Sequence, residues 1–145
     1  MILFAATFGE NRGAIHAHDG MITCLDATEN KLASGGLDKV VAIWDLRAIS
    51  SNNGFTHAIR KYKLDDTALL KVAIGPDSDY AATSTLKGLY LLDLITGTFR
   101  QADTSGGNNT GAPSNTGRYH DLKWIPSKVL YAVGDDSKLN GFVVK

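Results

Sequence analysis

Residues 18–45 constrain the fold more than any other part of the chain. They read HDGMITCLDATENKLASGGLDKVVAIWD, in which three short runs, Met21–Leu25, Lys31–Ser34 and Val40–Trp44, are separated by turn residues. Short runs bounded by Gly, Asn and Asp are typical of β-strands joined by tight turns. The segment therefore predicts three neighbouring strands rather than a helix.

Four polar or amphipathic side chains in this segment stand at positions where they could bond to one another. The indole N–H of Trp44, if buried, needs an acceptor, which the Ser34 hydroxyl provides while it donates onward. A neutral His18 accepts on one ring nitrogen and donates from the other to Asp38. We expect a connected polar chain of Trp44, Ser34, His18 and Asp38 that ties three strands and a turn together.

A serine, a histidine and an aspartate also suggest a hydrolase. A serine nucleophile needs an exposed turn and an oxyanion hole. Ser34 lies instead in Ala-Ser-Gly-Gly within a strand pattern. The structural interpretation is therefore favoured over the catalytic one.

The segment resembles one repeat of the WD-repeat β-propeller family. That pattern has a histidine before the first strand, a small-Ser-Gly in the second, an aspartate in the next turn and Trp-Asp ending the third; here they are His18, Ala33–Gly35, Asp38 and Trp44–Asp45. The resemblance implies an all-β fold, a partial WD-repeat β-propeller of four-stranded antiparallel blades.

The rest of the chain repeats this plan with weaker similarity. Leu92–Asp93 stands where Trp-Asp would be, and Asp66 replaces the histidine, so this repeat is expected to lack the polar chain. We expect a single partial propeller over residues 1–145, divided into outer strands of an incomplete blade (1–17), a blade (18–64), a second blade (65–102), a flexible insertion (103–117) and an incomplete blade (118–145).

About three and a half repeats fall short of the ~4–8 blades that close a propeller. The missing blades would come from a longer chain or from a second subunit. Because a partial ring exposes blade faces that are normally buried, we expect that the isolated chain is not a stable monomer.

Composition narrows the classes of partner. The chain has 15 Lys and Arg against 15 Asp and Glu, which gives no strong electrostatic signal for nucleic acid or anionic membranes. No apolar run is long enough to predict a membrane span. Cys24 is the one cysteine in the sequence, which fits a reducing compartment. We expect an intracellular protein, cytoplasmic or nuclear.

The resemblance implies a non-catalytic scaffold or adaptor that mediates protein–protein interactions within a multi-subunit intracellular complex, of the kind that is commonest in eukaryotes. Its partners would be protein chains or peptides bound by turns at one end of the blades, and the candidate contact residues are Asp19, Leu37, Lys39 and Lys87. Leu37 also permits a second interpretation, a leucine packed beside Trp44. No cofactor and no metal site are predicted.

Two alternatives are weaker. Arg60, Lys61 and Lys63 form a basic group that predicts a phospholipid- or nucleic-acid-associating edge, although a solvated strand gives the same pattern. An enzyme has still less support, because the other histidines (His16, His57 and His120) do not form a recognisable metal-ligand pattern.

Overall fold

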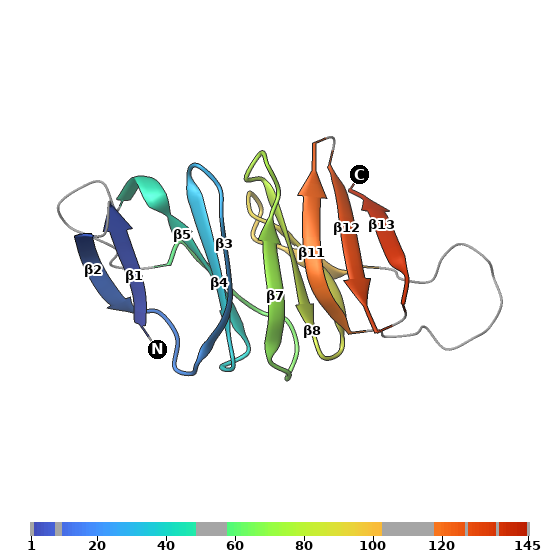
Figure 1. Cartoon of the computed structure of the whole chain (residues 1–145), viewed down its shortest axis with the longest axis horizontal. Coiled ribbons are helices and arrows are strands. Elements are labelled where there is room, and N and C mark those ends of the chain that lie inside the picture. Colours follow the sequence, from blue (N-terminus) through green and yellow to red (C-terminus); the bar gives the residue numbers. More distant parts are fainter. Residues whose placement is uncertain are drawn as a thin grey trace.

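The computed structural model describes residues 2–7, 10–48, 58–102, 118–126, 128–135 and 137–144 (Figure 1). The expected insertion at 103–117 lies outside the described residues. The prediction of an all-β fold is confirmed. The strands are β1 (Ile2–Thr7), β2 (Glu10–His16), β3 (Ile22–Ala27), β4 (Lys31–Gly36), β5 (Val40–Asp45), β6 (Arg60–Lys63), β7 (Leu69–Ile74), β8 (Tyr80–Thr85), β9 (Gly88–Asp93), β10 (Phe99–Gln101), β11 (Tyr119–Ile125), β12 (Val129–Gly134) and β13 (Leu139–Val143), and one 3-10 turn, η1 (Leu46–Ala48), follows β5.

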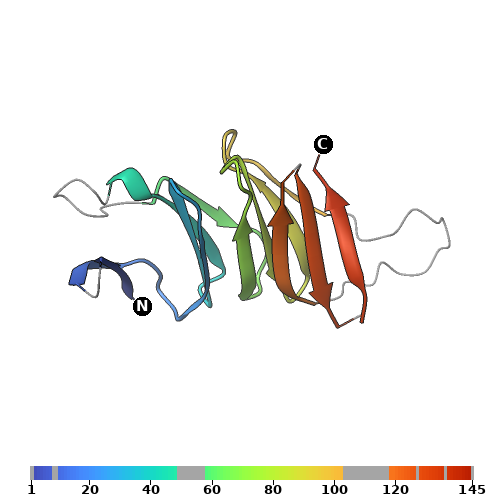
Figure 2. The same ribbon diagram turned by 45° about the horizontal axis from the view of Figure 1, so that its top comes forward.

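These strands form four antiparallel sheets that follow one another along the chain (Figures 1 and 2). A two-stranded N-terminal hairpin (β1–β2) precedes the first full sheet (β3–β6) and the second full sheet (β7–β10), each of four strands. A three-stranded sheet (β11–β13) completes the series. In the last three sheets, each strand pairs with the next strand in sequence, which is a meander.

The first strand of each of these three sheets has a register irregularity near its start. It falls at Ile22/Cys24 in β3, at Leu69/Lys71 in β7 and at Tyr119/Asp121 in β11. A β-bulge increases the local twist of a strand. The repeated position indicates that the three sheets are built on the same plan.

The burial pattern separates the central sheets from the last one. In β4 and β5 nearly every side chain is buried on both faces, whereas β12 alternates between buried and exposed positions. Full burial is expected of strands that are covered on both sides, and alternation is expected of a sheet that is covered on one side. The three-stranded sheet therefore has one covered face.

Two apolar cores join the sheets. One lies between the first and second full sheets and includes Val41, Ile43, Val72 and Leu92. The other joins the second full sheet to the three-stranded sheet, and its members include Ala82, Leu89, Leu122, Trp124 and Leu130. Most of the apolar burial that stabilises the fold is thus between sheets.

Hydrogen bonds between sheets reinforce these cores along the first strands. The Thr23 hydroxyl donates to the Leu69 carbonyl at 2.6 Å, and the Ile74 N–H donates to the Asp26 carboxylate at 2.7 Å. The Trp124 indole donates to the Ala73 carbonyl at 3.0 Å. The starts of β3 and β7 are consequently held side by side.

Among the described residues, the outer strand of the first full sheet comprises Arg60–Lys63. An outer strand that faces water has a weak hydrophobic pattern, which does not mark its ends in the sequence. The described part of the chain holds no helix that could span a lipid bilayer.

Candidate protein-binding site

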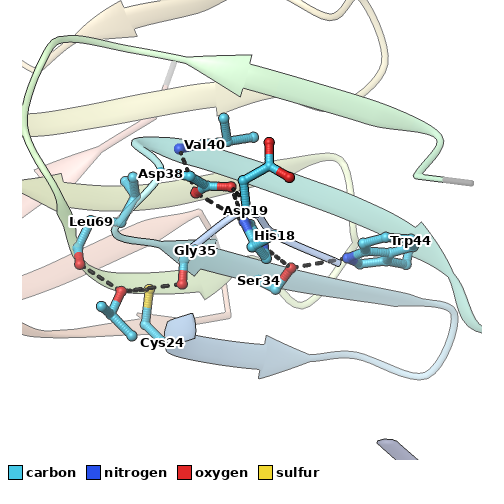
Figure 3. A network of polar contacts seen from close by, with 10 residues as sticks. His18, Asp19, Cys24, Ser34, Gly35, Asp38, Val40, Trp44 and Leu69 are labelled. Atoms are coloured by element: carbon cyan, nitrogen blue, oxygen red, sulfur yellow. Dashed lines mark hydrogen bonds and ion pairs between the residues drawn. The ribbon is translucent and has the colours of Figure 1, made fainter. Parts of the chain in front are cut away.

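The structure brings together the four side chains His18, Ser34, Asp38 and Trp44 (Figure 3). The Trp44 indole N–H donates to the Ser34 hydroxyl at 3.0 Å, and that hydroxyl lies 2.7 Å from Nε2 of His18. Nδ1 of His18 lies 3.0 Å from both carboxylate oxygens of Asp38. Because Ser34 accepts from the indole, its proton is directed to Nε2, which assigns the His18 proton to Nδ1 and makes it a donor to Asp38.

Asp38 also holds the turn that follows β4. Its carboxylate accepts hydrogen bonds from the N–H of Asp19 at 3.2 Å and from the N–H of Val40 at 3.3 Å. The carboxylate therefore bonds backbone on both sides, before β3 and at the start of β5. The turn Leu37–Lys39 is fixed relative to the sheet, even though Lys39 adopts a left-handed backbone conformation with φ of 69°.

Ser34 has no exposed surface from which to attack a substrate. It is fully buried, and its hydroxyl is engaged by both Trp44 and His18. A nucleophilic serine needs an exposed oxygen beside an oxyanion hole. This geometry gives Ser34 a structural role.

Gly36 is a residue of this site that the sequence analysis did not single out. A Cβ at this position would lie 2.8 Å from the Asp38 carboxylate and 3.1 Å from Nδ1 of His18. Only glycine leaves room for the pair at that distance. The signal available in the sequence was the second glycine of Ala-Ser-Gly-Gly, which directly precedes the turn.

In the place of the Trp–Ser–His–Asp chain, the second full sheet has a polar cluster of different composition, which the sequence analysis did not predict. One Asp65 carboxylate oxygen accepts from the N–H and hydroxyl of Thr67, at 2.7 and 2.6 Å. The other accepts from the Thr85 hydroxyl at 2.7 Å and from the Tyr90 hydroxyl at 2.9 Å. The acidic residue is Asp65 and not Asp66, whose side chain is exposed and paired with Lys87.

The surroundings of Asp65 and Tyr90 change their acidity in opposite directions. Burial raises the pKa of Asp65, but the hydrogen bonds from Thr67, Thr85 and Tyr90 outweigh it, and the net pKa is lowered. Burial and the hydrogen bond to the Asp65 carboxylate raise the pKa of Tyr90 to about 12. The cluster is therefore a carboxylate with a neutral phenol at neutral pH.

The four candidate contact residues lie at one end of the two full sheets. Asp19 and Lys39 flank the first polar network, and Lys87 follows Thr85, whose hydroxyl accepts from the Lys87 N–H at 3.0 Å. Two apolar side chains lie in the same turns, with exposed fractions of 46% for Leu37 and 41% for Leu86. The interpretation of Leu37 as a residue packed beside Trp44 is wrong, because Leu37 is exposed while Trp44 is buried.

We call these five residues, Asp19, Leu37, Lys39, Leu86 and Lys87, the loop face. β3 and β7 both start at this end, as the bond from Thr23 to the Leu69 carbonyl requires. The strand ends that precede the two turns pair with these strand starts. Gly36 at the end of β4 pairs with Ile22 in β3, and Thr85 at the end of β8 pairs with Leu69 in β7. Two exposed leucines are thus presented on turns that polar networks hold in place.

In the basic group of Arg60, Lys61 and Lys63 at the outer edge, the arginine is engaged in hydrogen bonds. Arg60 donates to the Leu94 carbonyl at 3.1 Å and to the Ile95 carbonyl at 2.6 Å, in the second full sheet. Lys61 and Lys63 remain exposed. Because Arg60 joins two sheets, the edge offers fewer cations to an anionic ligand than its sequence indicated.

The remaining candidate ligands and the thiol do not assemble into a reactive centre within the described ranges. His16 is exposed, His120 contacts Asp135, and His57 lies outside the described residues. No three His, Cys, Asp or Glu side chains of the described residues are grouped as metal ligands. Burial raises the pKa of the Cys24 thiol, which keeps it protonated at neutral pH.

Comparisons with known proteins support the fold. Neither a protein-family model nor a curated protein sequence matches the chain. Among solved structures, a chain of the mitotic checkpoint complex is 21% identical with a TM-score of 0.73, over 96% of this chain and 42% of that chain. The computationally designed Ika4 protein is 15% identical with a TM-score of 0.72, over 94% of this chain and 74% of that chain.

The designed Ika8 protein is also similar, at 15% identity with a TM-score of 0.69, over 94% of this chain and 37% of that chain. At these identities the likeness concerns the fold alone. The chain spans less than half of the length of the checkpoint chain and of Ika8. Together with the succession of antiparallel sheets, the comparisons assign a propeller-like all-β fold.

Proposed function

We propose that the chain is part of a WD-repeat β-propeller and serves as a non-catalytic scaffold or adaptor for protein–protein interactions. It would act within an intracellular, multi-subunit complex of a eukaryotic cell, in the cytoplasm or the nucleus. The WD-repeat assignment is supported by the four-residue network of the first full sheet. Similarity to a chain of the mitotic checkpoint complex, a multi-protein assembly, supports protein partners.

The observation that carries the proposal is the loop face. Leu37 and Leu86 are exposed on adjacent turns, and each turn is held by a carboxylate that bonds several donors. Exposed apolar side chains on a rigid support lose little conformational entropy when a partner binds. Lys39, Lys87 and Asp19 around them supply the polar rim that is usual at protein interfaces.

A non-catalytic role is supported by the state of the groups that chemistry would need. The serine of the apparent triad is buried and the thiol is protonated at neutral pH. Each polar network bonds to backbone and side-chain groups of its own sheet. Both networks would then serve to position the loop face.

The experiment is a comparison of partners captured by the wild-type chain and by a Leu37→Glu, Leu86→Glu double variant. The matched control is Ile95→Glu, because Ile95 is 62% exposed and lies in the turn after β9, away from the loop face. Proteins that co-purify with the wild-type chain are identified by mass spectrometry. We expect specific partners to be lost from the double variant and kept by the control.

Two outcomes would contradict the proposal. One is a set of partners that both variants keep equally. The other is capture that depends on nucleic acid or anionic lipid and disappears with added salt, which would favour the basic edge. Circular dichroism on all three proteins verifies that each is folded.

A further inference from the structure

A small cavity lies between the turn that joins β7 to β8 and the turn that joins β11 to β12, near the top of the view in Figure 1. We call it the turn slot. Its lining consists of two prolines (Pro76 and Pro126), two aromatic side chains (Tyr80 and Trp124) and three charged ones (Asp77, Asp79 and Lys128). Its volume is about 100 Å³, well below the ~300–1,000 Å³ of pockets that hold small molecules. The turn slot therefore suits a single side chain of a protein partner.

The corresponding junction between the first and second full sheets is closed. There the Lys31 ammonium donates to the Ser78 carbonyl at 2.6 Å, and the hydroxyls of Thr28 and Ser78 lie 2.6 Å apart. Tyr80 takes the place of Lys31 in the next sheet, because each begins the second strand of its sheet and pairs with the last residue of the third strand. Among the described residues, no side-chain hydrogen bond joins the two turns that border the turn slot. The turn slot is thus open where the preceding junction is fastened.

Trp124 contributes a fixed aromatic surface to the turn slot. Its indole N–H donates to the Ala73 carbonyl at 3.0 Å, which sets the orientation of the ring. Gly75 has no side chain to cover this ring, and a Cβ there would lie 3.7 Å from Cδ2 of Trp124, in van der Waals contact. The rest of Trp124 is buried. A ring that is held in this way needs no rearrangement before a partner binds, which lowers the cost of binding.

The Tyr80 ring already holds a cation. The ammonium of Lys128, from the opposite turn, lies over this ring at 5.2 Å from its centre, within the range of a cation–π interaction. Lys128 is exposed, and a cation–π interaction at an exposed site is weak. The Tyr80 ring therefore attracts a cation, and the cation of a partner can take the place of Lys128.

Asp77 and Asp79 give the turn slot a negative side. Asp77 is exposed and Asp79 is partly buried, and neither carboxylate forms an ion pair with another described residue. Lys31 does not line the turn slot, because the Ser78 carbonyl holds its ammonium in the preceding junction. With two carboxylates and one ammonium in its lining, the turn slot accepts a second cation without building up positive charge.

We propose that the turn slot binds an arginine side chain of a protein partner, with the guanidinium against the rings of Tyr80 and Trp124. Its N–H groups would donate to Asp77 or Asp79. Arginine fits this lining better than lysine, because the planar guanidinium stacks on aromatic faces, is weakly hydrated and can bond a carboxylate through two N–H groups. A proline would fill the apolar part of the turn slot but leave both carboxylates partly desolvated without a partner.

This contact would be separate from the loop face. The turn slot follows the end of β7, whereas the loop face lies at the end of the sheets where β3 and β7 start. A partner held by Leu37 and Leu86 therefore does not cover the turn slot. The chain would have two contact sites, an apolar one at one end of the strands and a cation-binding one at the other.

The test is an NMR titration of the whole 145-residue chain with the peptide acetyl-Gly-Gly-Arg-Gly-Gly-amide. The chain has two tryptophans, Trp44 and Trp124. The indole N–H signal of Trp124 should shift with a Kd of about 1–10 mM, as expected for one anchored side chain. The signal of Trp44, which is buried in the first full sheet, should not move. Lysine in place of arginine should raise the Kd at least about threefold, and citrulline or proline at least about tenfold.

Charge variants locate the binding to the turn slot. The double variant Asp77→Asn, Asp79→Asn should raise the Kd at least about fivefold, whereas Glu29→Gln, an exposed acid in the turn between β3 and β4, should leave it unchanged. Lys128→Gln removes the competing ammonium and should lower the Kd about two- to fivefold. Its matched control is Lys123→Gln, which removes an exposed cation of β11 outside the turn slot and should have no effect.

Three outcomes would overturn the proposal. The first is a Trp124 signal that does not shift at peptide concentrations up to about 20 mM, well above the expected Kd. The second is a lysine, citrulline or proline peptide that binds as tightly as the arginine peptide. The third is a double aspartate variant that binds as tightly as the wild type. None of these outcomes bears on partner capture by the loop face, so the two proposals fail separately.

Discussion

The first and second full sheets perform the same structural task with different chemistry. In the first, His18 before β3 bonds to Asp38 in the turn after β4, and Ser34 and Trp44 extend the chain across the sheet. In the second, a single carboxylate, Asp65, stands before β7 and collects four donors. The acid lies in the turn in one sheet and before the first strand in the other.

Both networks fasten the segment before the first strand to the far end of the second strand. The comparison indicates that the connection between these two segments matters to the fold, and that different sets of residues can make it. A chain of hydrogen bonds and a single multiply bonded carboxylate both satisfy the buried polar groups at that point. Perturbing each network should reveal how much stability depends on its particular chemistry.

The largest effect is expected from Ser34→Ala. The change removes the acceptor of the Trp44 indole and the donor to His18 in a fully buried position, which should cost about 2–4 kcal/mol in the free energy of unfolding. Thr83 is the equivalent position of the second full sheet by register and donates a single hydrogen bond to the Lys71 carbonyl. Thr83→Val should therefore cost only about 1 kcal/mol.

Denaturant titrations of both variants measure this difference. Equal losses in the two sheets would show that the hydroxyl at this position serves packing alone. A loss in Ser34→Ala that disappears in the background of His18→Ala would show that the two residues act as one network.

The first network could be predicted from the sequence, whereas the second could not. His18, Ser34, Asp38 and Trp44 are distinctive residue types whose hydrogen-bonding requirements match one another. The second network consists of an aspartate, two threonines and a tyrosine, and its acid has an aspartate neighbour. The backbone path into β7 decides that Asp65 and not Asp66 points inward. The two residues are of the same type, so the sequence does not distinguish them.

The strands of the first full sheet were predictable for a similar reason, whereas the outer face of the three-stranded sheet was not. Turn residues delimit the three short runs of residues 18–45, which agree with β3, β4 and β5 to within one or two residues at each end. The outer face of the three-stranded sheet depends on the register between β12 and β13, which decides that Tyr131 lies opposite Gly141. A shift of one residue would direct these side chains to the other face of the sheet.

Asp65→Asn should produce the second largest effect, about 1–3 kcal/mol at neutral pH, because the amide cannot accept all of the hydrogen bonds that the carboxylate accepts. The lowered pKa of Asp65 also predicts the direction in which the stability of the fold changes with pH. Its contribution is fully present above the unfolded-state pKa of about 3.9 and is lost as pH falls through the lower, folded-state value. The variant should lose less stability than the wild type on acidification below about pH 4.

Urea midpoints at pH 7 and at several values below pH 4 provide the measurement. Wild type and variant that lose stability in parallel with falling pH would rule out Asp65 as the titrating group. The Asp38→Asn variant, which breaks the corresponding connection in the first full sheet, is measured at pH 7 for comparison.

Tyr90→Phe should have a smaller effect at neutral pH, about 1 kcal/mol for one hydrogen bond, and a distinct effect in alkali. The folded-state pKa of Tyr90 is raised to about 12, above the ordinary value of about 10. Its contribution is therefore present below about pH 10 and is lost as pH rises towards 12. The loss of stability across that window should be smaller in the variant, as thermal melts at successive pH values would measure.

The smallest effect is expected from Asp66→Asn, which removes the ion pair with Lys87 beside the second network. Both side chains of this pair are largely exposed, so water and salt screen the attraction. The unfolding midpoint should be unchanged within error, and added salt should not separate variant from wild type. A substantial loss would mean that Asp66 and not Asp65 fastens the turn, and the comparison between the two sheets would then have to be drawn around the exposed acid.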